Sequence, residues 1–256
     1  MLSNIIEIII LSLVQGISEF LPISSSAHLN IVEIIFKFKS NSLMIDVALH
    51  LGSLLAIIFY FKKELLDLQK NRKILLLIII GSIPIIITGY VLYSTKYIYL
   101  FKGNLEIIAW ATLVFGIVLF FADKCKFDKK ISSNLNLKTI IYIGLFQILA
   151  LIPGVSRAGI TLTAARIFKF NRVDAGKISF LMAIPALTGA SVLSLKDTFQ
   201  QSFDFNYLVL VAVPLSFVFS YFTVRFFLQY INQFSLNVFV IYRIIVALIL
   251  FKIIYF

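Results

Sequence analysis

The chain has 256 residues, of which 61% are hydrophobic and only 14% are charged, and it carries a formal net charge of +11. Soluble domains are about 45–50% apolar and about 25% charged, so this composition excludes an ordinary soluble domain. The basic residues lie between apolar runs, which fits membrane topology, and we expect no nucleic-acid partner. The composition predicts an all-α integral membrane protein.

Six apolar runs are each long enough to cross a hydrocarbon layer of about 30 Å as a helix. They cover residues 43–61, 74–93, 105–122, 178–195, 207–228 and 237–256. Two other apolar regions, 5–36 and 139–168, are interrupted near their middles by "FLPISSS" and "LIPGVSR". Each half is too short to cross, so we expect two re-entrant helical hairpins whose breaks face an interior cavity.

The basic residues between the spans predict the orientation of the chain. Three connections, at 62–73, 123–138 and 169–177, hold most of them, and the positive-inside rule places these connections in the cytoplasm. The first hairpin then enters from outside and the second from inside. The basic residues concerned are Lys62, Lys63, Lys70, Arg72, Lys73, Lys124, Lys126, Lys129, Lys130, Lys138, Lys169, Arg172 and Lys177.

A hairpin followed by three spans occurs twice in opposite orientations, which predicts an inverted-topology repeat with its breaks meeting near the midplane. The spacing of Pro22 and Pro84 nearly equals that of Pro153 and Pro214, and each pair joins a break to the second following span. The predicted organisation is a single polytopic membrane domain over 1–256, with repeat 1 at 1–122, a cytoplasmic linker at 123–136 and repeat 2 at 137–256.

Polar residues gather at the first break, in "QGISEFLPISSSAH". Gln15 and Glu19 are four residues apart and share a helix face, as do Ser25 and His28 beyond the break. Pro22 ends the first limb, and the serines can cap the second limb. This arrangement leaves free backbone N–H groups at the start of the second limb.

The second break, in "PGVSRAGIT", repeats this logic. Pro153 and Gly154 make the turn, Ser156 can cap the following helix, and Arg157 shares a face with Thr161. Two helix N-termini aimed at one cavity form an anion site. Arg157 adds a forked cation that suits phosphate oxygens.

An acid at membrane depth costs about 2.5 kcal/mol or more, so Glu19 needs a partner or a task. Arg157 is the expected partner, and a purely structural ion pair is the main alternative. His28 taken alone is more often a satisfied core residue than a catalytic one. The isolated serines can equally bond back to their own helix.

Three further polar features leave alternatives open. His50 follows Asp46 by one helical turn in "IDVALHLGS", where local pairing competes with a catalytic role. Arg225 and Arg243 lie within spans, where they could reach the cytoplasmic surface or a buried acid.

At these residues the chain resembles the undecaprenyl-diphosphate phosphatase family, also called the bacitracin-resistance family. The family motif "xGxxEFLPxSSxxH" stands here as "QGISEFLPISSSAH", and "PGxSRSGxT" stands as "PGVSRAGIT". A third marker, "HLGSLLA", also matches, and the resemblance covers essentially the whole chain. Two departures are Gln15, where the family often has a second acid, and Ala158 in place of a serine.

The resemblance implies hydrolysis of undecaprenyl diphosphate to undecaprenyl phosphate and inorganic phosphate, which recycles the cell-wall lipid carrier and confers bacitracin resistance. It implies a bacterial plasma-membrane protein with an active site facing the outer, periplasmic side. It also implies dependence on a divalent metal, Mg²⁺ or Ca²⁺. Because magnesium usually takes one or two carboxylates plus substrate oxygens, we expect Glu19 and Gln15, with the diphosphate, to form a sparse metal site. The partners are then the bilayer and the polyprenyl diphosphate, and a homodimer is left open.

We expect Glu19, Ser25, His28 and Arg157 to be catalytic. Ser25 with His28 as its base is the favoured nucleophile, while direct attack by His28 or by a water activated through Glu19 remains open. A secondary transporter or lipid flippase for an anionic substrate is the alternative function, since it would share broken helices and a midplane arginine. The expected phosphate-binding residues are Ser24, Ser26, Gly154, Ser156, Arg157 and Thr161.

Overall fold

A computed structural model describes residues 2–36, 43–97, 103–125, 129–200 and 207–255 of the chain. The described residues fold almost entirely into helices, apart from an isolated bridge between Lys129 and Phe170. The elements are α1 (Leu2–Ser18), α2 (Ser25–Phe36), α3 (Leu43–Tyr60), α4 (Lys62–Leu66), α5 (Leu68–Ser94), α6 (Leu105–Lys124), α7 (Ile131–Asn134), α8 (Leu137–Ile148), the 3-10 turn η2 (Leu149–Leu151), α9 (Arg157–Ile167), α10 (Arg172–Gln200), α11 (Leu208–Gln233) and α12 (Asn237–Tyr255).

Six of these helices, α3, α5, α6, α10, α11 and α12, are long and apolar enough to cross a membrane. They confirm the six predicted spans and the all-α membrane fold. Two of them start earlier than predicted, α5 at Leu68 and α10 at Arg172. Lysine and arginine are good helix formers, so a helix can begin inside a basic connection before its apolar run.

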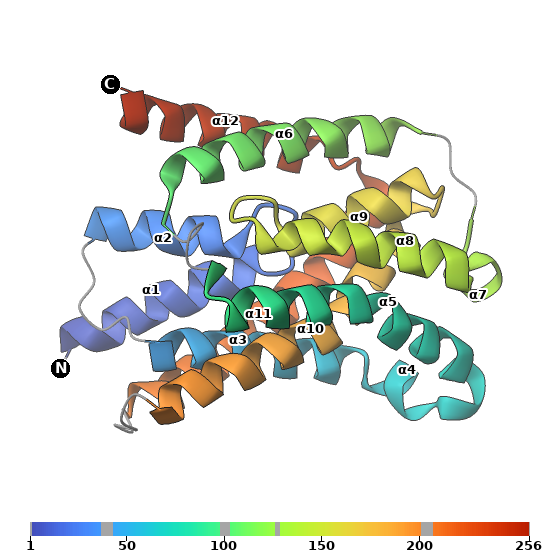
Figure 1. The fold of residues 1–256 in the computed structure, drawn as a ribbon, viewed down its shortest axis with the longest axis horizontal. Helices are drawn as coiled ribbons and strands as arrows, with labels where there is room; N and C mark the ends of the chain where they lie inside the picture. The colour runs from blue at the N-terminus through green and yellow to red at the C-terminus, as the bar shows by residue number, and fades with distance from the viewer. Residues whose placement is uncertain (1, 37–42, 98–102, 126–128, 201–206, 256) are drawn as a thin grey trace.

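The two interrupted segments form helical hairpins, α1 with α2 and α8 with α9 (Figure 1). The first hairpin lies in the half of the molecule that holds both termini, and the second lies in the opposite half. Their breaks, the first break (residues 19–24) and the second break (residues 152–156), lie together near the middle. This is the arrangement that two re-entrant hairpins require; their re-entry within a bilayer stays a prediction.

The two halves of the chain exchange packing partners. A Cβ added at Gly16 of α1 would lie 2.5 Å from Cβ of Phe219 in α11. A Cβ added at Gly144 of α8 would lie 1.9 Å from the carbonyl oxygen of Gly81 in α5. The first hairpin therefore packs tightly on α11, and the second hairpin packs tightly on α5. Each of these two helices is the second spanning helix of the half to which it belongs. An inverted repeat predicts this exchange, and the repeat boundaries themselves stay a prediction.

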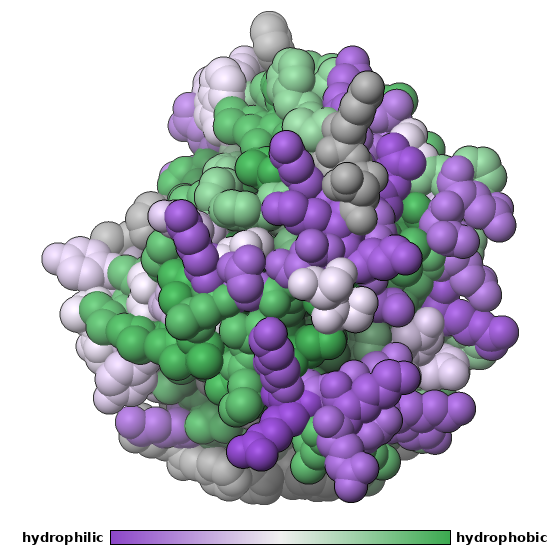
Figure 2. Space-filling view, turned by 90° about the vertical axis from the view of Figure 1, so that its right-hand side faces the viewer, coloured by the Kyte–Doolittle hydropathy of each residue, from purple (hydrophilic) through white to green (hydrophobic). Residues whose placement is uncertain are grey.

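Hydrophilic side chains gather at the end of the molecule that holds α4 and α7 (Figure 2). Lys62 and Lys63 begin α4, and Lys129 and Lys130 precede α7. These residues belong to the connections that the positive-inside rule assigns to the cytoplasm. Lys126, which belongs to the same predicted group, lies outside the described residues.

Asp123, which begins the predicted linker, is a buried residue in the last turn of α6. Its carboxylate forms ion pairs with Arg166 of α9 at 2.9 Å and with Arg172 of α10 at 2.9 Å. It also accepts from the backbone N–H of Leu236, before α12, at 3.1 Å. One acid thus joins four elements at the basic end of the molecule.

We expect Asp123→Ala to destabilise the protein by about 3–5 kcal/mol, because it leaves two arginines without their buried partner. The midpoint of denaturant unfolding in detergent would measure the loss. Lys124→Ala is the matched control, since Lys124 is the exposed neighbour of Asp123. Equal midpoints for the two variants would contradict the role assigned to Asp123.

Candidate active site

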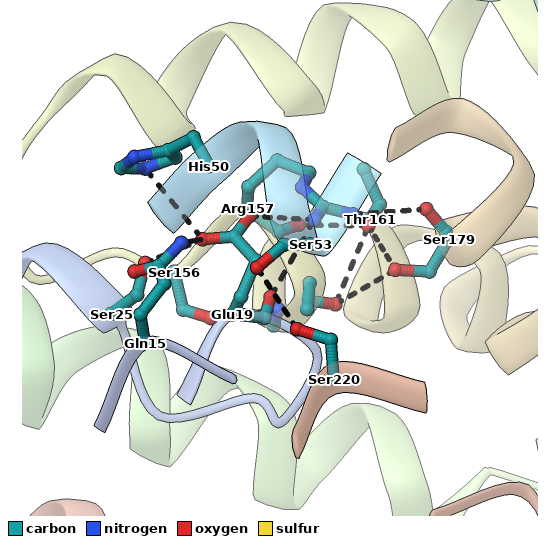
Figure 3. A network of polar contacts seen from close by, with 12 residues as sticks. Gln15, Glu19, Ser25, His50, Ser53, Ser156, Arg157, Thr161, Ser179 and Ser220 are labelled. Atoms are coloured by element: carbon teal, nitrogen blue, oxygen red, sulfur yellow. Dashed lines mark hydrogen bonds and ion pairs between the residues drawn. The ribbon is translucent and has the colours of Figure 1, made fainter. Parts of the chain in front are cut away.

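Glu19 is the centre of a polar cluster that lies where the two breaks meet (Figure 3). Arg157 Nη2 donates to its Oε1 at 2.8 Å, and the glutamate side chain is only 5% exposed. The predicted Glu19–Arg157 pair is therefore confirmed as a contact. Ser25 Oγ donates to Glu19 Oε2 at 2.7 Å and Gln15 Nε2 donates to the same atom at 3.1 Å. Three donors hold the carboxylate in place.

Arg157 begins α9 and reaches across to the first hairpin. Its Nη1 donates to the carbonyl of Ser179 at 3.3 Å, and its guanidinium lies 5.7 Å from the centre of the Phe20 ring. Among the described residues its Nε is buried without a hydrogen-bond partner. A buried donor without a partner costs about 1–3 kcal/mol, so the protein leaves this N–H unsatisfied at that cost.

The structure does not pair Ser25 with His28. His28 Nδ1 contacts the carbonyl oxygen of Ser24 at 2.6 Å, and its Nε2 contacts the hydroxyl of Tyr242 at 2.6 Å. Both ring nitrogens are engaged, while the Ser25 hydroxyl turns to Glu19. The spacing of Ser25 and His28 along one helix predicted that they lie near each other. It could not predict that Tyr242, from another helix, would bind the imidazole.

His50 of α3 joins the site, although the sequence left its role open. Its Nδ1 contacts the backbone carbonyl of Asp46 at 2.8 Å, and its Nε2 lies 4.0 Å from Glu19 Oε2. The local pairing anticipated with Asp46 is thus made to the backbone. The sequence signals for this residue were its spacing from Asp46 and the short marker "HLGSLLA".

The cluster encloses a cavity of about 150 Å³. Four hydroxyls and three ionisable groups face it, and the starts of α2 and α9 both lie on its wall. Helix N-termini favour negative charge because their first N–H groups have no partner within the helix. The cavity is therefore suited to an oxyanion. Its lining residues are Glu19, Ser24, Ser25, Ser26, His50, Ala150, Ser156 and Arg157.

Each break ends on a serine with a left-handed backbone. Ser24 has φ +76° and Ser156 has φ +70°, and each immediately precedes a helix. Such residues cost about 1–3 kcal/mol and persist where the surroundings hold them. Ser156 Oγ also accepts from the N–H of Gly159 at 3.1 Å, which confirms the predicted cap. Gln15 and Gln147 precede these serines at equal spacing, as a duplication predicts.

Two residues expected to bind phosphate do not line the cavity. Thr161 is fully buried, and its hydroxyl contacts Ser179 Oγ at 2.7 Å and the carbonyl of Arg157 at 2.8 Å. A Cβ at Gly154 would lie 2.5 Å from the carbonyl oxygen of Ile108, so this glycine faces α6. Both residues support the backbone of the second break instead of presenting donors to a ligand.

Glu19 offers carboxylate oxygens to a divalent cation, whereas Gln15 turns its amide Nε2 to Glu19 Oε2. Gln15 is fully buried, and its Oε1 has no hydrogen-bond partner among the described residues. The same residues contain no cluster of three or more acidic, histidine or cysteine side chains that could hold a metal alone. Mg²⁺ often takes one or two carboxylates and completes its shell with phosphate oxygens and water. Glu19 in the cavity wall suits such a cation, and Gln15 would add an oxygen with its amide group reversed.

The fold and site define a polytopic membrane protein with a buried acid, a forked cation and hydroxyls around a cavity suited to an oxyanion. The family model described as Bacitracin resistance protein BacA matches residues 8–249, and the chain belongs to this family. It is 76% identical to a protein of Pelagibacter ubique named undecaprenyl-diphosphatase, with both chains covered fully. Proteins of the same name from Elusimicrobium minutum and Alteromonas mediterranea are 38% and 36% identical, with at least 96% of each chain covered.

Proposed function

We propose that the protein hydrolyses undecaprenyl diphosphate to undecaprenyl phosphate and inorganic phosphate. The observation that carries the proposal is the triad of Ser25, Glu19 and Arg157, which two separate breaks bring to one small cavity. The name of the relatives specifies the substrate. The reaction would recycle the lipid carrier of cell-wall synthesis and give resistance to bacitracin.

The contacts of Ser25 favour the hydroxyl as nucleophile and Glu19 as its base. The Ser25 proton passes to Glu19 Oε2 as Oγ attacks the terminal phosphorus, because these two atoms already share a hydrogen bond of 2.7 Å. The bond from that phosphorus to the bridging oxygen breaks, and undecaprenyl phosphate leaves with the proton that Glu19 took from Ser25. Glu19, again a carboxylate, then takes a proton from the water that attacks the phosphoserine. The bond from phosphorus to Ser25 Oγ breaks, inorganic phosphate leaves, and the proton on Glu19 returns to Ser25 Oγ. Attack by such a water on the substrate itself is the competing scheme.

Arg157 and the two helix starts would neutralise the charge that develops on the transferred phosphoryl group, since phosphoryl transfer depends mainly on positioning and electrostatic stabilisation. The unpartnered Nε of Arg157 leaves a donor for a phosphate oxygen. Mg²⁺ or Ca²⁺, held by Glu19 and Gln15, would supply further neutralisation of the diphosphate when bound. His50 of α3 lines the cavity and would contact a phosphate oxygen there.

The location we propose is the bacterial inner membrane, with the cavity open to the periplasmic side. Ser25 and Ser26 start α2, in the half of the molecule opposite the basic end (Figures 1 and 2). His50 lies in the first half of α3. The six spans support a multi-pass membrane protein, and its apolar surface leaves the isoprenoid tail in lipid while the head group enters the cavity.

The test is phosphate release from undecaprenyl diphosphate by the purified protein in detergent with Mg²⁺ or Ca²⁺. We expect turnover, its loss on chelation, and its return when the metal is restored. The double variant Glu19→Gln/Arg157→Ala gives the background from contaminating phosphatases. A transporter or flippase for an anionic substrate would release no phosphate above that background, and such a result would refute the proposal.

A further inference from the structure

Arg243 lies in the first half of α12, and it is only 1% exposed. A guanidinium has five N–H donors, and all five are used here. The acceptors are backbone carbonyl oxygens: Nε donates to Thr112 at 3.0 Å, Nη1 to Pro22 at 3.2 Å and Val155 at 3.0 Å, and Nη2 to Ala111 at 3.3 Å and Gly154 at 2.9 Å. The sequence left open whether Arg243 reaches the cytoplasmic surface or pairs with a buried acid. Among the described residues its side chain does neither.

The accepting carbonyls belong to both breaks and to the helix behind them. Pro22 lies in the first break, and Gly154 and Val155 lie in the second break. The remaining two acceptors lie on α6. One side chain thus ties together two loops that are more than a hundred positions apart in the sequence, directly beside residues that line the cavity.

The contact with Val155 also sets the direction of a donor. In a trans peptide the C=O of one residue and the N–H of the next point to opposite sides, and no cis bond occurs in the described chain. The N–H of Ser156 therefore points away from Arg243. Because Ser156 and Arg157 line the cavity, Arg243 fixes the orientation of the peptide group from which α9 begins.

Two glycines leave room for the Arg243 side chain. A Cβ at Gly116 of α6 would lie 3.2 Å from Arg243 Cβ and 3.4 Å from its Nε. A Cβ at Gly159 of α9 would lie 3.1 Å from Arg243 Nη1. The shortest distance at each glycine, 3.2 Å and 3.1 Å, is tighter than ordinary van der Waals contact, so a side chain at either position would push the guanidinium from its carbonyls.

Tyr242, the residue before Arg243 in α12, is linked to the first break through His28. The hydroxyl of Tyr242 contacts His28 Nε2 at 2.6 Å, and His28 Nδ1 contacts the carbonyl of Ser24 at 2.6 Å. Tyr242 and Arg243 together fix the backbone on both sides of Ile23. This contact gives His28 a structural task that explains why it turns away from Ser25.

Arg243 has no carboxylate within ion-pair distance in the described part of the chain. A buried charge without a partner is costly unless oriented dipoles or an anion compensate it. The five carbonyls supply the dipoles, and a diphosphate in the adjacent cavity would supply the anion. We propose that Arg243 is the positioning residue of the phosphate site, which locks both breaks together and adds positive charge behind them. This inference rests on the proposed function for the identity of the ligand.

The test compares Arg243→Lys and Arg243→Gln with the wild type. Lysine has three donors on a flexible stem and cannot bind five carbonyls. Misplacement by about 1 Å can cost about 10²-fold in rate, so we expect kcat to fall by about 10²-fold in both variants. KM should stay near the wild-type value in Arg243→Lys, which keeps the charge, and rise in Arg243→Gln, which loses it.

Arg166→Lys is the matched control. Arg166 is also buried and also donates to backbone carbonyls, those of Phe170 and Asp123, but it lies at the basic end of the molecule. We expect it to lower the unfolding midpoint while the folded enzyme keeps its kcat. Hydrogen exchange should become faster in residues 20–26 and 152–158 of Arg243→Lys and remain unchanged there in Arg166→Lys.

Wild-type kcat in folded Arg243→Lys would overturn the positioning role, as would an equal loss of kcat in Arg166→Lys. If neither Arg243 variant folds, Gly116→Ala displaces the guanidinium without removing it, and an unchanged kcat there overturns the role as well. A wild-type protein that released no phosphate would refute the proposed function alone. The hydrogen-exchange rates of the two breaks would still confirm or refute that Arg243 locks the breaks together.

Discussion

Arg157→Ala is expected to lower kcat/KM for undecaprenyl diphosphate by about 10³–10⁵-fold, because an arginine that stabilises phosphoryl-transfer charge has that range of effect. The variant also removes the partner of Glu19, whose Oε1 receives the 2.8 Å hydrogen bond from Arg157. Both losses act on the same reacting group. Steady-state phosphate release in detergent, at saturating Mg²⁺, measures the change.

Arg157→Lys separates charge from geometry. Lysine keeps the positive charge but loses the planar fork that spans Glu19 and the carbonyl of Ser179. We therefore expect it to recover only a small part of the lost activity. Arg225→Ala is the control, since Arg225 is an exposed arginine of a spanning helix. Activity of Arg157→Ala close to that of Arg225→Ala would show that the Arg157 pair is structural.

Hydropathy was enough to predict the six spans, because each crosses a hydrocarbon layer and must be apolar over its length. The lengths of the interrupted segments predicted two hairpins, and the cost of a buried acid predicted that Glu19 would meet Arg157. These predictions depend on local composition and on a strong energetic penalty. Both are visible without coordinates.

Directions of side chains were less predictable. Ser25 and His28 share a helix face, yet the imidazole faces Tyr242, more than two hundred positions away, and the hydroxyl faces Glu19. Thr161 shares a face with Arg157 but is covered by Ser179. The neighbour that a side chain meets depends on which helices pack together, and spacing along one helix cannot supply that information.

The buried charges at Asp123 and Arg243 were the largest features that the sequence did not resolve. Asp123 reads as the start of a basic linker, and only the fold brings Arg166 and Arg172 to it. The N–H donors of Arg243 bind backbone carbonyls. Every residue has a backbone carbonyl, so a sequence does not reveal which ones bind the arginine. Partners of this kind become visible only once the irregular backbone of the two breaks has been placed.

Glu19→Gln is the second change from which we expect a very large loss, of about 10³-fold or more in kcat. The amide keeps the size of the side chain but cannot accept the proton of Ser25 or of a water, and it no longer neutralises Arg157. Glu64→Gln is the matched control, since it makes the same change at an exposed glutamate of α4, outside the cavity. The readout is single-turnover phosphate release with enzyme in excess.

Ser25→Ala then decides which atom attacks. If the serine is the nucleophile, its loss removes the phosphoserine and should lower kcat about as much as Glu19→Gln, because residues that act as a unit are not additive. If water activated by Glu19 attacks directly, Ser25→Ala should retain most of the turnover while Glu19→Gln stays inactive. Wild-type turnover in Glu19→Gln would refute both schemes, because each takes its proton through that carboxylate.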